Sequence, residues 1–223
     1  MKIIQPKEGE TLDIELEESL LAKNRQLAKD NRALLDKNGV IGIDVMGSIG
    51  SGKTSLIKNL INKLKENHKI GVIAGDLTTE IDAQRLEQEN TQVIQVHTGK
   101  ECHLDANLIK RALASINLDD VNILFIENVG NLICPAEFPL GAHQRIVVIS
   151  VTEGPYMVVK HPFIFREAAV VAINKVDLKD SMNVSTDKLK EDVLKMNPQA
   201  KVFNTNCMTG EGIEEIIECM NFQ

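Results

Sequence analysis

The segment VIGIDVMGSIGSGKTSLIKNL, residues 40–60, decides the fold of this chain. Its apolar start, 40–45, predicts a buried strand, and a helical pattern at 53–66 begins where the glycines end. The residues between them have the spacing G-x-x-x-x-G-K-T, which curls the backbone so that successive N–H groups point at phosphate oxygens. Lys53 adds a cation for the terminal phosphates and a role in catalysis, and Thr54 offers a hydroxyl to Mg²⁺. The predicted nucleotide-binding residues of this loop are Gly47, Ser48, Ile49, Gly50, Ser51, Gly52, Lys53, Thr54 and Ser55.

Short β-branched runs alternate with helical patterns along the rest of the chain. Further strands are predicted at 70–74, 92–96, 122–126, 145–151, 170–173 and 201–203, and further helices at 79–89, 105–116, 186–196 and 212–220. Most of these strands are apolar throughout, as expected when helices cover both faces of a parallel sheet. The sequence therefore predicts one α/β domain over 39–223, a doubly wound and mostly parallel P-loop NTPase fold.

Residues 1–38 are expected to form an N-terminal helical extension. A leucine stripe runs through a predicted helix between 11 and 37, at Leu16, Leu20, Leu27 and Leu34. We expect this stripe to pack against the following domain. It spans too few heptads to favour the alternative, a coiled-coil seam.

The composition excludes several classes of protein. Of the 223 residues 43% are hydrophobic and 26% are charged, which is ordinary globular usage. A net charge of −7 and an aromatic content of 3% argue against nucleic-acid binding. Apolar runs stop far short of the ~20 residues that cross a bilayer, so no membrane association is expected. Four cysteines are too few for a disulfide scaffold. We therefore expect a cytoplasmic protein whose thiols are free to bind metal.

The motif Asn174-Lys175-Val176-Asp177 follows a predicted strand and points to guanine. The Asp177 carboxylate can accept two hydrogen bonds from a purine with an N1–H and a 2-amino group, which guanine has and adenine lacks. Asn206 and Cys207 occupy the place where GTPases usually have Ser-Ala-Lys, so the Cys207 backbone N–H is expected to contact the guanine oxygen.

Two carboxylates end predicted strands at the edge where ligands bind in parallel sheets. Asp76 and Glu127 are expected to hold Mg²⁺ with Thr54 and to take part in catalysis. For Asp76, an alternative is that it caps the helix that follows. Glu127 begins Glu127-Asn128-Val129-Gly130, the D-x-x-G pattern with Glu in place of Asp. Asn131 follows where some GTPases have a water-orienting Gln, so slow intrinsic hydrolysis is expected.

Cys102 and His103 follow the predicted strand 92–96, and Cys134 follows the strand 122–126 that Glu127 ends. All three can therefore converge on the same edge of the sheet. Two thiols and an imidazole suit Zn²⁺ or Ni²⁺. Three ligands leave a closed site incomplete, and a two-fold dimer that pools two sets would complete it. The alternative is that these residues are buried structural residues, and spacing alone favours neither.

Together these motifs resemble the hydrogenase nickel-insertion GTPases, often called the HypB family, which are relatives of the urease accessory GTPases. The resemblance begins near residue 30 and rests on 47–54, 75–77 with 82–85, 101–104, 127–132, 134–138 and 174–177. The urease relatives usually have Cys-Pro-His at the metal motif. This chain has Cys102-His103 and a separate Cys134, so the hydrogenase branch fits better.

The resemblance implies a GTPase that delivers nickel to nickel–iron hydrogenase and forms a homodimer favoured by GTP. Cys102, His103 and Cys134 would bind Ni²⁺ or Zn²⁺ at the subunit interface. The implied partners are a small zinc-containing nickel chaperone and a hydrogenase large-subunit precursor. Related dimerising ATPases have a Lys at the position of Ser48, and Lys160 is a candidate replacement at the dimer contact. Alternatives are a urease-type nickel accessory GTPase, a small-molecule kinase, or a metal-binding module in which nucleotide is structural.

Overall fold

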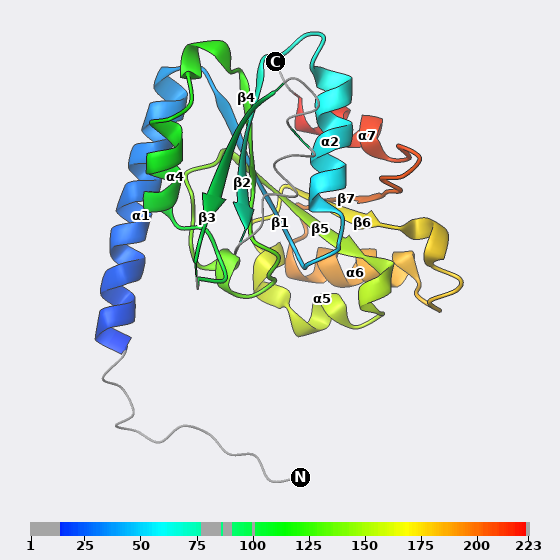
Figure 1. The fold of residues 1–223 in the computed structure, drawn as a ribbon. Coiled ribbons are helices and arrows are strands. Elements are labelled where there is room, and N and C mark those ends of the chain that lie inside the picture. Colours follow the sequence, from blue (N-terminus) through cyan, green and yellow to red (C-terminus); the bar gives the residue numbers. More distant parts are fainter. Residues whose placement is uncertain (1–13, 77–85, 87–90, 100, 222–223) are drawn as a thin grey trace.

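The computed structural model describes residues 14–76, 86, 91–99 and 101–221. Within them the chain forms a seven-stranded sheet in which every pairing is parallel, in the order β3-β2-β4-β1-β5-β6-β7 (Figure 1). The strands are β1 (Ile41–Gly47), β2 (Ile70–Asp76), β3 (Gln92–His97), β4 (Ile123–Glu127), β5 (Gln144–Ser150), β6 (Val170–Asn174) and β7 (Lys201–Asn204). The predicted doubly wound parallel fold is confirmed.

Helices cover both faces of this sheet. They are α1 (Ile14–Lys37), α2 (Lys53–Leu64), α4 (Ala106–Leu113), α5 (Met157–Lys160), α6 (Thr186–Met196) and α7 (Ile213–Met220). Because successive strand residues point to opposite faces, Ile43 and Val45 of β1 pack in the core under α2 and α7, whereas Met46 packs with α5 and α6. The half of this second face over β2 and β4 is covered by α1 and α4, which lie side by side (Figure 1). None of the described helices is both long and apolar enough to cross a membrane.

The predicted elements differ from the observed ones mainly at their ends. The strands shift by one or two residues. The helix expected at 105–116 begins after Asp105, whose side chain caps it by accepting a 2.7 Å hydrogen bond from Leu108 N, and it ends early at Leu113. The sequence missed α5 and the 3-10 helices η2 (Cys134–Ala136) and η4 (Pro162–Phe165), which are too short to show periodicity. The helix expected at 79–89 lies outside the described residues except for Leu86, which is helical and buried.

The expectation that the leucine stripe packs α1 onto the domain is wrong for Leu20 and Leu34, whereas Leu27 is half-buried. Leu20 is 60% exposed and Leu34 is 36% exposed. The buried positions are instead Asn24, Ala28, Asn31 and Leu35, at helical spacing. The Asn31 amide donates hydrogen bonds to Ala106 O at 2.8 Å and Leu140 O at 3.0 Å. The buried face of α1 therefore combines apolar packing by Ala28 and Leu35 with two asparagines that donate to backbone carbonyl groups, and hydrophobic periodicity does not reveal the asparagines.

Candidate functional site

A cavity of about 520 Å³ lies at the carboxyl ends of the central strands. It brings together the two motifs that the sequence assigned to phosphate and to base. Its lining residues include Gly50, Gly52, Lys53, Thr54, Ser55, Glu127, Asn174, Lys175, Asp177, Asn206 and Cys207. Of the predicted nucleotide-binding residues, all but Gly47, Ser48 and Ser51 line this cavity, which is large enough for a ligand of drug size.

The phosphate loop joins β1 to α2 as predicted. Gly50 and Gly52 adopt φ angles of 75° and 110°, in the left-handed region that favours glycine. A side chain at Gly52 would also clash with the Asn174 amide, whose Nδ2 would lie 2.2 Å from an added Cβ. The backbone conformation of the phosphate loop therefore requires glycine at both positions.

The reactive side chains of this loop are buried. Lys53 Nζ donates to the carbonyl oxygens of Gly47 at 3.3 Å and Ser48 at 3.0 Å, so the cation lies across the loop. Thr54 Oγ1 donates to Glu127 Oε1 at 2.7 Å, and both residues are less than 9% exposed. A hydroxyl and a carboxylate in contact are the hard oxygen donors that Mg²⁺ prefers.

Asp76, the third residue expected at the magnesium site, is the last residue of β2. Parallel pairing of β2 with β4 sets Ala74 opposite Glu127, so Asp76 lies at the same edge of the sheet. Its side chain lies outside what the structure describes, and its role stays a prediction.

The base-side motif is held against the phosphate loop by Asn174. Its Nδ2 donates to Ser51 O at 2.8 Å, and its Oδ1 accepts from Cys207 N at 3.1 Å. Lys175, in a left-handed conformation, donates from Nζ to Gly50 O at 2.8 Å. Asp177 is exposed on the cavity wall. The Cys207 N–H is directed at Asn174 in this structure, so its expected contact with a guanine oxygen stays a prediction.

The three predicted metal ligands converge. One ligand atom from each of Cys102, His103 and Cys134 lies within 4.8 Å of the others. The Cys102 thiol donates to the Cys134 sulfur at 2.9 Å, and His103 Nδ1 lies 3.9 Å from the Cys102 sulfur. The His103 ring lies 3.9 Å from the ring of Phe138, centroid to centroid. Two thiols and an imidazole at this spacing match a soft or borderline divalent cation.

The environment of these ligands favours their neutral forms when no cation is present. The hydrogen bond with Cys134 raises the pKa of the Cys102 thiol, and partial burial adds to this rise. Burial lowers the pKa of His103, although Glu101 and Asp105 oppose the shift. A neutral imidazole is the form that binds metal. A cation between the two sulfurs would favour the thiolate forms that the raised pKa otherwise disfavours.

The segment that leads to Cys134 contacts the phosphate loop through Gly130 and Asn131. Asn131 N donates to Gly47 O at 3.1 Å, forming an isolated antiparallel bridge. At Gly130 an added Cβ would lie 2.9 Å from the backbone of Ile49, so the two segments touch. The sulfur atoms therefore lie on the nucleotide side of the sheet, as the continuity of 127–134 predicted.

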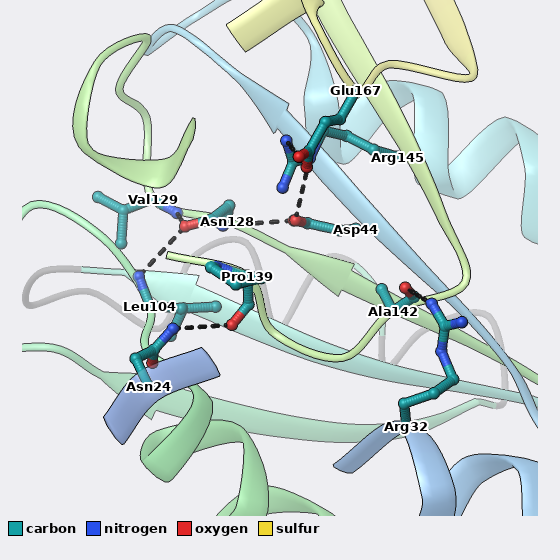
Figure 2. Close-up of polar contacts among 10 residues, drawn as sticks. All are labelled: Asn24, Arg32, Asp44, Leu104, Asn128, Val129, Pro139, Ala142, Arg145 and Glu167. Carbon is teal, nitrogen blue, oxygen red and sulfur yellow. Dashed lines mark hydrogen bonds and ion pairs between the residues drawn. The ribbon is translucent and has the colours of Figure 1, made fainter. Parts of the chain in front are cut away.

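Sequence reasoning missed a buried polar network behind this segment (Figure 2). Asn128 Oδ1 accepts from Leu104 N at 3.2 Å, and its Nδ2 donates to Asp44 Oδ1 at 3.3 Å. Asp44 in turn lies 3.7 Å from Arg145 Nε, and Arg145 pairs with Glu167. Burial raises the pKa of Asp44 to about 6, against the lowering effect of Arg145. The available signal was one acidic residue, Asp44, within an otherwise apolar strand.

The sequence also missed Glu153, whose carboxylate contacts Ser48. Ser48 Oγ donates to Glu153 Oε1 at 2.6 Å, and the same carboxylate oxygen accepts from Ser150 N. Burial raises the pKa of Glu153, while the bond from Ser48 and the nearby Lys175 and Lys53 lower it. Lys160, the candidate dimer residue, is exposed at the end of α5.

Comparison with known proteins shows the family of this chain. The family model described as "CobW/HypB/UreG, nucleotide-binding domain" matches residues 42–204, which is most of the chain. The chain belongs to this family. It is 48% identical over 205 residues to the probable hydrogenase maturation factor HypB of Methanocaldococcus jannaschii, which covers 92% of this chain and 93% of that relative.

Solved structures agree with this assignment. Hydrogenase maturation factor HypB from Archaeoglobus fulgidus superimposes with a TM-score of 0.84 at 43% identity, covering 89% of this chain and 97% of that one. HypB from Helicobacter pylori, solved in complex with nickel, gives a TM-score of 0.84 at 35% identity, covering 89% and 93%. The resemblance to the HypB family predicted from the motifs is confirmed.

Proposed function

We propose that this chain is a GTP-hydrolysing metallochaperone that delivers nickel during maturation of nickel–iron hydrogenase. The observation that carries the proposal is the convergence of Cys102, His103 and Cys134 on a segment bonded to the phosphate loop. The name of the Methanocaldococcus relative and the nickel complex of the Helicobacter structure support it. Nickel is the cargo in this proposal.

The phosphate half of the cavity supplies the residues for hydrolysis. Lys53 neutralises charge that develops on the terminal phosphates, and Thr54 with Glu127 and Asp76 holds Mg²⁺. When bound, Mg²⁺ would neutralise negative charge on the phosphate oxygens. The described cavity lining contains no Gln or His to orient the attacking water, which supports slow intrinsic turnover.

The base half supports selection of GTP over ATP. Asp177 lies on the cavity wall beyond Lys175, where a carboxylate meets the donor edge of guanine. Asn174 holds the loop of Asn206 and Cys207 against the phosphate loop, so the base and phosphate contacts form together.

A second copy of the chain would complete the metal site. Three donors leave a fourth position open in a tetrahedral site, and Cys102 is exposed. Large apolar side chains are exposed around these segments, at Ile49, Ile133, Tyr156, Val159 and Phe163. Exposed apolar side chains of this kind support a protein contact, to which Lys160 would add a charge. GTP and metal would each favour the homodimer.

The remaining assignments follow from the same proposal. We place the GTPase domain at 39–223 with a helical extension at 1–38, and the protein in the cytoplasm. Its partners are a small zinc-containing nickel chaperone and the hydrogenase large-subunit precursor.

Sizing by light scattering tests the proposal. The full chain is measured with GDP and with a non-hydrolysable GTP analogue, each with and without Ni²⁺, with elemental analysis of the eluted protein. We expect a dimer with the GTP analogue and Ni²⁺, and bound nickel at about one ion per dimer or more. Phosphate release from GTP but not ATP, in the absence of any acceptor, excludes a small-molecule kinase. Nickel binding without GTP turnover would favour a metal-binding module instead.

A further inference from the structure

The side chain of Asn131 connects the two segments that carry the metal-binding thiols. Its Nδ2 donates to the carbonyl oxygen of Cys102 at 3.2 Å, and its Oδ1 accepts from Ile133 N at 2.9 Å. Ile133 directly precedes Cys134 in the chain. A single amide therefore fixes the main chain at Cys102 relative to the main chain next to Cys134.

The backbone of Asn131 is fixed by the phosphate loop. Its N–H donates to Gly47 O, and Gly130 before it packs against Ile49 with no room for a side chain. A shift of the phosphate loop is consequently transmitted to Asn131 over one hydrogen bond. The amide then carries that shift to both thiol-bearing segments.

We propose that Asn131 is a positioning residue that couples the state of the phosphate loop to the spacing of the Cys102 and Cys134 sulfurs. This proposal rests on the proposed function and gives its metal site a means of regulation. Its basis is that both polar atoms of the amide are engaged by the main chains of the two metal-binding segments. A water-orienting role, the other use of a residue after Gly130, requires an amide directed into the nucleotide cavity, and Asn131 is not among the residues that line that cavity.

The experiment compares the full chain with Asn131→Ala and Asn131→Gln. Nickel affinity is titrated with GDP bound and with a non-hydrolysable GTP analogue bound, following the absorption of the thiolate–nickel bond. GTP turnover is measured in parallel without nickel. Asn107→Ala, which changes an exposed asparagine at the start of α4, is the matched control.

We expect Asn131→Ala to weaken nickel binding by about 10–100-fold, the usual loss when a group that orients a metal ligand is removed. The ratio of nickel affinities between the two nucleotide states should move towards one. Metal-free turnover should fall by a smaller factor than nickel affinity. Asn131→Gln, whose longer side chain does not fit the same bridge, should behave like Asn131→Ala, and Asn107→Ala should match the wild type.

Two results would overturn the proposal. One is wild-type nickel affinity and an unchanged affinity ratio in folded Asn131→Ala, with folding checked by circular dichroism. The other is a turnover that rises in Asn131→Gln and falls in Asn131→Ala while nickel affinity stays constant, which assigns Asn131 to the attacking water. Failure of the wild-type chain itself to bind nickel or hydrolyse GTP would instead overturn the proposed function.

Discussion

Thr54 Oγ1 donates a 2.7 Å hydrogen bond to Glu127 Oε1, which joins the first turn of α2 to the last residue of β4. This contact brings together two groups that lie 73 residues apart in the chain. Since the backbone continues from Glu127 through Asn131 to Cys134, the carboxylate beside the phosphate loop and the thiol proposed to bind metal belong to one segment.

Replacing Thr54 by Val removes the hydroxyl and keeps the shape of the side chain. We expect GTP turnover to fall by about 10²–10³-fold, the loss typical when one group that stabilises transition-state charge is removed. Thr54→Ser keeps the hydroxyl and should retain most of the activity. Phosphate release over a range of Mg²⁺ concentrations checks this, and equal turnover in the Val and Ser variants would contradict it.

Replacing Asp177 by Asn should reduce the preference for GTP. The carboxylate accepts two hydrogen bonds from guanine, whereas an amide presents a donor to one of the same groups, so selectivity should fall by about 10²-fold or more. Competition between labelled GTP and ATP measures this selectivity. Asp180→Asn, on the exposed surface three residues further on, is the control. If Asp177→Asn keeps the wild-type preference for GTP, the assignment of Asp177 to guanine recognition is wrong.

Replacing Cys134 by Ser should abolish nickel binding at micromolar concentrations. The thiolate is a ligand in our assignment, so the loss should exceed the about 10–100-fold typical of groups that only orient a ligand. Cys102→Ser should give the same loss, and Cys219→Ser, at an exposed thiol in α7, should give none. Equilibrium dialysis with elemental analysis measures all three. Equal loss in all three variants would point to unspecific thiol binding.

Asp44 should make the protein less stable as the pH rises. Its pKa is about 6 in the folded chain against 3.8 for an ordinary Asp, so between these values the folded state holds a proton that the unfolded state has released. The contribution of Asp44 to the free energy of unfolding is therefore largest below pH 3.8 and is lost as the pH rises through about 6. Two pKa units correspond to about 3 kcal/mol.

Urea denaturation of the wild type and Asp44→Asn from pH 4 to pH 7.5 checks this dependence. The difference in their free energies of unfolding should shift in favour of the variant by about 3 kcal/mol over that range. Comparing the two proteins cancels the titration of every other group. A difference that stays constant with pH would show that Asp44 remains ionised throughout.

Replacing Asn31 by Ala should destabilise the whole domain, because α1 is held by this amide. Two buried carbonyl oxygens, of Ala106 and Leu140, would lose their donor, at a cost of about 2–4 kcal/mol. Asn38→Ala removes only an exposed local bond to Leu34 O and should cost much less. Thermal unfolding compares the two. Equal small losses would mean that residues 14–37 do not contribute to the stability of the sheet domain.

The features that could be predicted from the sequence are those formed by residues close together in the chain. Residue types at fixed spacing predict a function for three motifs, namely the phosphate loop, Asn174–Asp177 and the Cys102-His103 pair. Strands that are apolar throughout predict a parallel sheet. Two of these motifs meet in one cavity because all parallel strands end at the same edge.

What the sequence did not reveal depends on contacts between distant residues. Asp44 and Asn128 are 84 positions apart and meet only because β1 pairs with β4. The packing face of α1 was assigned to positions that include Leu20 and Leu34, whereas its buried face includes Asn24 and Asn31, whose amides are satisfied by backbone groups far away in the chain. The role proposed for Asn131 likewise became visible only when both of its partners were in place.

The antiparallel bridge between Gly47 and Asn131 joins the phosphate loop to the segment that leads into Cys134 within one domain. The coupling that we propose therefore requires no hinge between domains, because a movement of the phosphate loop would reach the Cys134 sulfur through residues 131–134. Under the proposed function, a partner that takes the metal would dock at the edge of the sheet where the nucleotide binds.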